Sequence, residues 1–130
     1  MHDSSPKITT FFMFSGQAEE AMQYYTSVFK PSGIMSIFHQ EDGTVLHAVF
    51  NLKGQTFMAI DYNHQDKHPF TPALSLFVTC DSEEEIHSVF DQLSQEGRVL
   101  MPLEASPVSQ QFGWVEDKYG VSWQLNLAKD

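Results

Sequence analysis

The sequence predicts an α+β fold made of two copies of one βαβββ module. A β-prone segment leads into a helical pattern near residue 17, and the same succession recurs near residue 82. Each helical pattern is followed by strand-like segments, and each half closes on a Gly-x-x-aromatic pattern, at Gly54 to Phe57 and at Gly120 to Trp123. A repeated unit that cannot bury its apolar face alone is expected to pack against its copy, so we expect function in the cleft between the two.

The first module is predicted over residues 7–62, after an N-terminal tail at 1–6. Its helix is indicated by apolar residues at helical spacing, among them Ala18, Met22 and Tyr25, and Pro31 stops it. Turns at Asp42-Gly43 and Lys53-Gly54 separate the strands that follow the helix. The four expected strands of this module cover residues 8–14, 34–39, 44–52 and 55–61.

The second module is predicted over residues 73–127, after a linker at 63–72 that contains two prolines and no periodicity. Ser82-x-x-Glu85 has the pattern of a capping box and begins the helix, and Gly97 ends it. The expected strands cover residues 73–80, 98–101, 111–116 and 121–127, with a loop at 102–107. An offset of 66 residues aligns the closing hairpins and matches Gly54 with Gly120, Phe57 with Trp123, and Val49 with Val115.

The composition limits the classes of partner. Seven basic against seventeen acidic residues give a net charge of −10, which disfavours nucleic acid and favours a neutral or cationic ligand. No apolar stretch reaches the ~20 residues of a membrane span, so no membrane partner is expected. Cys80 is the only cysteine and the first residues lack the pattern of a signal peptide, which together indicate a cytoplasmic protein.

Motifs at both ends of the chain and in its middle indicate a family. They are Phe12-x-Phe14-x-Gly16-x-Ala18-x-x-Ala21, His47-Ala48, Met58-Ala59-Ile60-Asp61 and Trp114-Val115-Glu116-Asp117-x-x-Gly120-Val121-x-Trp123. With the βαβββ repeat, they resemble the vicinal oxygen chelate superfamily of glyoxalase I, extradiol dioxygenases and bleomycin-resistance proteins, over about residues 7–127. Within it the chain resembles the PhnB-like branch, often labelled 3-demethylubiquinone-9 3-methyltransferase-like. The resemblance implies a homodimer and a glyoxalase-like curled mixed sheet around a cleft, with the helices outside.

The resemblance also locates the metal positions of the superfamily's enzymes, on the first and last strand of each module. In this chain they hold Thr10, Met58 (or Ala59 with a register shift of one), Ser75 and Gln124. None is a histidine or carboxylate, so the sequence predicts neither a metal nor another cofactor. Methyl transfer usually needs a glycine-rich turn for S-adenosylmethionine, and the chain has no Gly-x-Gly-x-x-Gly motif.

Period-two alternation, together with the resemblance, predicts which side chains face the cleft. Leu46, Ala48 and Phe50 are expected to point toward a helix, as are Leu74, Leu76 and Val78. The expected cleft is apolar with a few polar groups, which is typical of a small-molecule pocket; the alternative is a closed core. Its predicted ligand-binding residues are Thr10, Phe12, Met58, Ser75, Phe77, Trp114 and Gln124, where Trp114 either lines the cleft or packs in the core.

His47 is the predicted catalytic residue, because it is the cleft-facing group that titrates near neutral pH. A structural histidine is the alternative. His64-x-x-x-His68 with Asp61 and Asp66 has the residue types of a metal pair but lies in the proline-rich linker. Asp61 itself is expected to cap or lie at the surface, and Cys80 to be a small core residue.

Three functions remain open at this point. The first is a metal-free site for a small organic ligand, with or without a reaction in which His47 moves a proton. The second is a non-catalytic sequestering protein of the bleomycin-resistance type, which would attract a cationic ligand. The third is a metal-dependent lyase or dioxygenase with atypical ligands.

Overall fold

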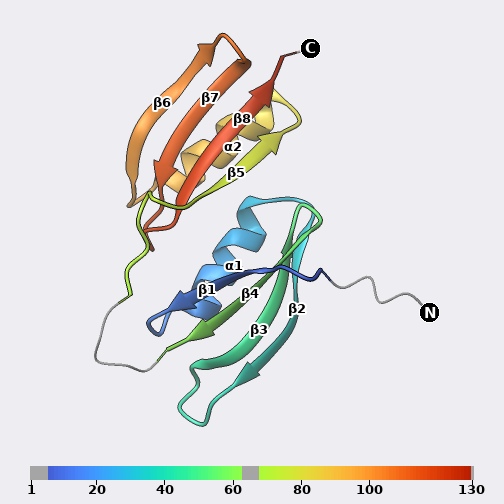
Figure 1. The fold of residues 1–130 in the computed structure, drawn as a ribbon, viewed down its shortest axis with the longest axis vertical. Coiled ribbons are helices and arrows are strands. Elements are labelled where there is room, and N and C mark those ends of the chain that lie inside the picture. Colours follow the sequence, from blue (N-terminus) through green and yellow to red (C-terminus); the bar gives the residue numbers. More distant parts are fainter. Residues whose placement is uncertain (1–5, 63–67, 130) are drawn as a thin grey trace, which may run out of the picture. The chain divides into compact units, whose positions relative to one another are not determined.

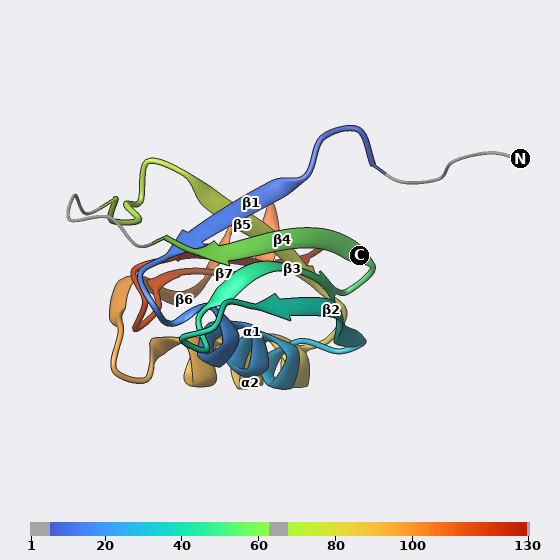
Figure 2. The ribbon, with the colours of Figure 1, turned by 90° about the horizontal axis from the view of Figure 1, so that it is seen from below.

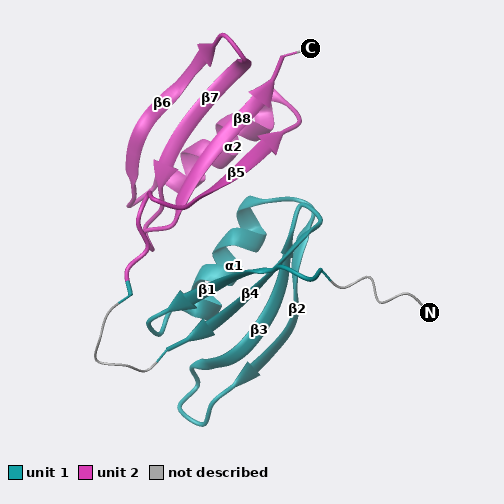
Figure 3. Ribbon diagram, in the orientation of Figure 1, with its two compact units in different colours: residues 1–68 teal, residues 69–130 magenta. Residues whose placement is uncertain are grey.

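The computed structural model describes residues 6–62 and 68–129 and has the βαβββ order twice (Figure 1). Residues 1–5 of the predicted tail and residues 63–67, the first half of the predicted linker, lie outside the described residues. The chain divides into two compact units, Met1–His68 and Pro69–Asp130 (Figure 3). Among the described residues, no helix is long and apolar enough to cross a membrane.

The first unit holds a four-stranded mixed sheet in the order β1-β4-β3-β2, with the helix α1 on one face. Strand β1 runs parallel to β4, and the other neighbours are antiparallel. Its elements are β1 (Thr10–Phe14), α1 (Ala18–Val28), β2 (Ser32–His39), β3 (Val45–Leu52) and β4 (Gln55–Asp61).

The second unit repeats this plan in the order β5-β8-β7-β6, with α2 on one face. Strand β5 is parallel to β8, as β1 is to β4. Its elements are β5 (Ser75–Cys80), α2 (Glu83–Ser94), β6 (Arg98–Ser106), β7 (Ser109–Glu116) and β8 (Ser122–Ala128). The predicted α+β fold of two βαβββ modules is confirmed.

Each helix packs on one face of its own sheet, and we call the opposite, helix-free face of each sheet its open face (Figure 2). The buried core of each unit lies between sheet and helix. In the first unit the core is aromatic. The ring centroids of Phe12 and Tyr25 on α1 are 6.4 Å apart, and those of the stacked Phe50 and Phe57 rings are 5.4 Å apart. In the second unit Trp123 and Leu125 are buried, together with Ile86 of α2.

The start of α2 follows the predicted capping box. Ser82 Oγ accepts a hydrogen bond from the Glu85 backbone N at 3.1 Å, and Glu85 Oε1 accepts one from the Asp81 N at 2.7 Å. Two groups at the helix start that have no intrahelical partner are thereby satisfied. The three glutamates of the first turn also suit the positive end of the helix dipole.

The predicted loop at 102–107 is wrong, because β6 continues to Ser106 and only Pro107 and Val108 form a turn. Pro102 was the reason for expecting a loop. Strand β6 lies at the edge of its sheet, where a residue without an N–H is tolerated. Three irregularities in its pairing with β7 accommodate the strand.

The offset of 66 residues holds for β4 and β8 but not for β3 and β7. Phe50 pairs with Phe57 in the first hairpin and Val115 with Trp123 in the second, so the second connection is one residue longer. Val115 therefore corresponds to Phe50, and both are fully buried. The predicted match of Val49 with Val115 is wrong by one position.

Candidate functional site

The orientation predicted for β1 is wrong. Phe12 is 4% exposed and packs against Tyr25 of α1, so it belongs to the core. Thr10 lies on the same face, since it is two residues away and pairs with the buried Phe57. The residues of β1 on the open face are Phe11 and Met13. Every residue of β1 after Thr10 is apolar, so alternation alone could not select the buried face.

His47 and Met58 lie on the open face of the first sheet, as predicted from alternation, since their neighbours Ala48, Phe57 and Ala59 are buried. The Phe11 ring stands edge-on to His47, with 6.2 Å between the ring centroids. Among the described residues, the His47 imidazole has this ring contact and no side-chain hydrogen bond. No carboxylate in that part of the chain therefore orients the imidazole in the way that activates a general base.

A bulge in β3 lies directly before His47. Phe38 pairs with His47 but the next residue, His39, pairs with Val45, so Leu46 is an extra residue. Val45 is consequently buried and Leu46 is 57% exposed, which corrects the prediction that Leu46 points toward the helix. Bulges often redirect side chains beside functional sites, which keeps His47 a candidate.

The open face of the second sheet carries a hydrogen-bonded group of four side chains from three strands, Ser75, Trp114, Ser122 and Gln124. Trp114 Nε1 donates to Ser122 Oγ at 2.8 Å. Ser122 Oγ lies 2.6 Å from Ser75 Oγ, and Gln124 Nε2 donates to Ser75 Oγ at 3.4 Å. We call these four residues the serine network. Sequence reasoning named three of them and missed Ser122.

The register of the strands explains why these side chains meet. Ser75 on β5 pairs with Ser122 on β8, and Gln124 on β8 pairs with Trp114 on β7. On the other face, Gly113 lies so close to α2 that a Cβ there would be 2.9 Å from the Phe90 ring. Trp114 therefore points away from the helix, which settles its orientation toward the open face. Ser122 lies directly opposite Ser75 on the neighbouring strand, and this pairing of two serines could have identified Ser122 as a site residue.

Two aromatic side chains accompany the serine network on the same face. Phe77 pairs with Gln124 and is 60% exposed. Its ring stacks on Phe112 of β7, with 6.3 Å between centroids. Fixed polar groups beside accessible aromatic rings are the usual composition of a small-molecule site.

The positions of the superfamily's metal ligands do not fit a divalent ion. Thr10 faces the core, and Met58 offers only a thioether to a hard or borderline cation. Ser75 and Gln124 hold neutral oxygens and hydrogen-bond with each other. In the described part of the chain, no three His, Cys, Asp or Glu residues are grouped so as to hold a metal. Of the linker's predicted metal pair, His64 and Asp66 lie outside the described residues.

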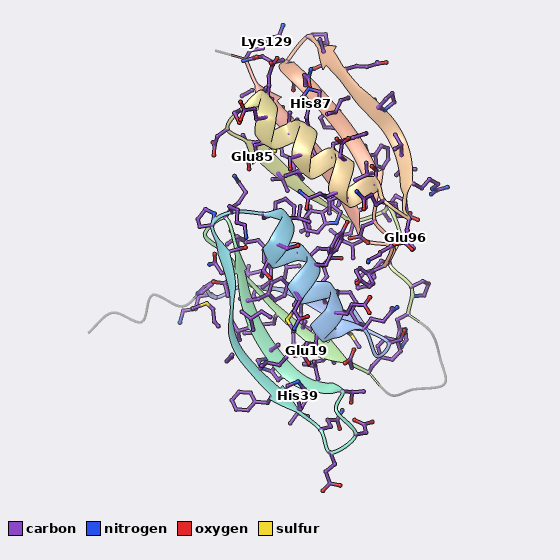
Figure 4. The ribbon with its side chains drawn as sticks, turned by 180° about the vertical axis from the view of Figure 1, so that it is seen from behind. Glu19, His39, Glu85, His87, Glu96 and Lys129 are labelled. Carbon is purple, nitrogen blue, oxygen red and sulfur yellow. The ribbon has the colours of Figure 1, made fainter. Side chains whose placement is uncertain are left out.

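A contact between α1 and β2, formed by Glu19 and His39, lies away from the open face of the first sheet. Figure 4 shows Glu19 on α1 near His39, at the end of β2. His39 Nε2 lies 2.7 Å from Glu19 Oε1, and both side chains are about 40% exposed or more. An exposed pair of this kind contributes at most about 1 kcal/mol to the free energy of unfolding. We therefore interpret it as a surface contact and not as part of a functional site.

Comparison with known proteins agrees with this geometry. The sequence profile of the family described as 3-demethylubiquinone-9 3-methyltransferase matches residues 6–126. The chain belongs to this family. The chain is similar to the solved structure of a PhnB protein from Bacillus cereus. The two are 56% identical and superpose with a TM-score of 0.87, over 95% of this chain and 100% of the other. The protein YjdN of Escherichia coli is 23% identical over 141 residues, 94% of this chain and 95% of its own.

The family has the glyoxalase-like fold. A glyoxylase/bleomycin resistance protein/dioxygenase domain from Frankia matches with a TM-score of 0.71 over 98% of this chain, at 14% identity. At that identity the likeness establishes the fold alone. The family profile and the Bacillus cereus structure thus confirm the PhnB-like resemblance, and the Frankia domain confirms the glyoxalase-like fold.

Proposed function

We propose that the protein binds a small organic molecule on the open face of its second sheet without using a metal ion. The serine network carries this proposal, because four side chains from β5, β7 and β8 converge there beside the Phe77 and Phe112 rings. The family name refers to methyl transfer, but the sequence has no glycine-rich motif of the kind that usually binds S-adenosylmethionine.

The two tryptophans of the chain provide the test. Trp114 Nε1 belongs to the serine network, whereas Trp123 Nε1 donates to the buried Asp117 on the other face. In ¹⁵N-labelled protein, titration with acetophenone, benzamide and other small aromatic compounds should move the Trp114 indole signal and leave that of Trp123 in place. A set of compounds that moves neither indole signal would contradict the proposal.

A pair of variants tests whether the aromatic residues contribute. Phe77→Ala should weaken binding by about three- to tenfold, because it removes one accessible ring. Val108→Ala is the matched control, since Val108 is 81% exposed in the turn after β6 and away from the serine network. Equal weakening in both variants would place the binding elsewhere.

Sequestration of a cationic compound is the second candidate, and the net charge of −10 favours it. An exposed aromatic face in a negative field attracts cations. Binding of a cationic aromatic probe such as benzyltrimethylammonium should then weaken as salt is raised, and the probe should be recovered unchanged. Salt-independent binding would exclude this candidate.

Catalysis is proposed only through His47, on the open face of the first sheet. It requires that a bound compound be converted, which mass spectrometry of the recovered compound detects. His47→Gln should then abolish product formation while its urea denaturation midpoint stays close to that of wild type. Product formation that persists in this variant would remove His47 from the reaction.

We also place the protein in the reducing cytoplasm, since a chain with one cysteine cannot form an internal disulfide. Cys80, the single cysteine of the sequence, is buried at the end of β5. Fractionation of cells that produce the native chain tests this assignment.

A further inference from the structure

The direction of the hydrogen bonds in the serine network is fixed at its Trp114 end. An indole nitrogen can donate a hydrogen bond but cannot accept one. Ser122 Oγ, 2.8 Å away, therefore accepts from Trp114.

Burial then fixes the proton of Ser122. This residue is 1% exposed, and among the described residues its hydroxyl has one available acceptor, Ser75 Oγ at 2.6 Å. If Ser75 donated instead, the Ser122 proton would be buried without a partner, which native structures avoid. Ser122 therefore donates to Ser75.

The oxygen of Ser75 is consequently fully used. It accepts from Ser122 and, over a longer distance of 3.4 Å, from Gln124 Nε2. A serine oxygen offers two acceptor positions and one proton. Only the hydroxyl proton of Ser75 remains available for a further hydrogen bond. Ser75 is half-buried and lies two positions before the exposed Phe77.

Resting on the ligand site proposed above, we infer that its ligand carries a carbonyl-type oxygen and that Ser75 binds this oxygen by donating its hydroxyl proton. Trp114 and Ser122 are positioning residues, because they act through the direction they impose on Ser75. The Phe77 ring supports the apolar or aromatic body of the same ligand.

Two probes of nearly equal shape separate this inference from the site proposal. Acetophenone has a carbonyl oxygen, and α-methylstyrene has a methylene group in its place. Both should shift the Trp114 indole signal, and acetophenone should bind about three- to tenfold more tightly because of one hydrogen bond. Equal affinities would overturn the inference while leaving the site intact, and no shift with either probe would overturn both.

Variants of the network assign the preference to Ser75. Ser75→Ala should bring the affinity ratio of the two probes close to one by weakening acetophenone alone, whereas Ser75→Thr keeps a hydroxyl and should keep the preference. Gln124→Glu is the independent variant, since its carboxylate accepts the Ser75 proton and should abolish the preference in a protein that still has Ser75. A preference that survives in both Ser75→Ala and Gln124→Glu would contradict the inference.

Discussion

Each unit has a buried aspartate whose carboxylate accepts several hydrogen bonds from within that unit. Asp61 Oδ1 accepts from the Gly16 and Ala18 backbone N atoms and its Oδ2 from the Val45 N, all at 2.9 Å. It thereby caps α1, whose own N-cap residue makes no side-chain cap bond. Of the two predicted roles for Asp61, capping or a place at the surface, the structure shows capping, and its charge also suits the helix dipole.

Asp117 explains the motif near the end of the chain. Its Oδ1 accepts from the Tyr119 and Val121 N atoms, and its Oδ2 accepts from Trp123 Nε1 at 2.8 Å. Gly120 has a φ of 92°, which glycine adopts without strain. The Asp117-x-x-Gly120-Val121-x-Trp123 pattern therefore maintains the turn before β8.

Asp61→Asn should lower the free energy of unfolding by about 1–3 kcal/mol, because an amide nitrogen would face a backbone N–H that loses its acceptor. Urea denaturation followed by tryptophan fluorescence measures this change. Asp91→Asn, the same exchange at an exposed position of α2, should stay within about 0.5 kcal/mol of wild type. Equal effects of the two exchanges would show that Asp61 is not a structural centre.

Asp42 makes the β2–β3 turn sensitive to acid. Hydrogen bonds from the Thr44 side chain and backbone lower the pKa of this carboxyl below its usual 3.8. Because the folded pKa is lowered, the ionised form supports the turn above pH 3.8, and this support is lost as the pH falls through the lower pKa. The Thr44 amide signal should titrate with a midpoint below 3.8 in wild type and should not do so in Asp42→Asn.

At the scale of elements, Gly97 controls how β6 leaves α2. A Cβ at this position would lie 2.2 Å from the Glu116 backbone O, so the two backbones could not approach as they do. The positive φ of 58° belongs to Glu96. Gly97 follows the end of α2, as predicted. A glycine is needed there because two backbone segments approach closely, and not because the residue adopts a left-handed conformation.

Gly97→Ala should destabilise the protein by about 1–3 kcal/mol, because backbone atoms must move to make room for the methyl group. Gly33→Ala is the control, since nothing lies within 4 Å of a Cβ there and its φ is not positive. Thermal unfolding of both variants measures the difference. A Gly97→Ala protein as stable as Gly33→Ala would contradict the close approach.

The elements that the sequence predicts well are those with a one-sided pattern. Strand β8 alternates buried Trp123 and Leu125 with polar Ser122 and Gln124, so its register and open face follow from alternation. Strand β1 is apolar on both sides, so the burial of Phe12 depends on β4, which is distant in sequence. The length of β6 depends on its irregular pairing with β7, which alternation does not reveal. Ser122 was not predicted as a site residue because its role depends on hydrogen bonds to Ser75 and Trp114 on neighbouring strands.

At the scale of the whole molecule, large apolar side chains are exposed in both units. Phe11 is 47% exposed, Phe38 60%, Phe77 60% and Met101 46%. Exposed large apolar side chains are often found at interaction sites, and each sheet ends in two edge strands, which are a common place for strand pairing between chains. These features support the proposal that the protein is a homodimer.

Light scattering after size-exclusion chromatography should give twice the 14.8 kDa mass of one chain at micromolar concentration. Dissociation on dilution should follow a single dimer equilibrium. A mass of 14.8 kDa at every concentration would contradict the proposal.

Successive side chains of β8 alternate between the two faces of the sheet. Trp123 and Leu125 lie in the core, and Ser122 and Gln124 lie on the open face. Substitutions at the second set leave the first set untouched, because successive side chains of a strand point in opposite directions. Selectivity for new compounds can therefore evolve, or be engineered, at the half-exposed Gln124 without changing the core residues on the other side of the strand.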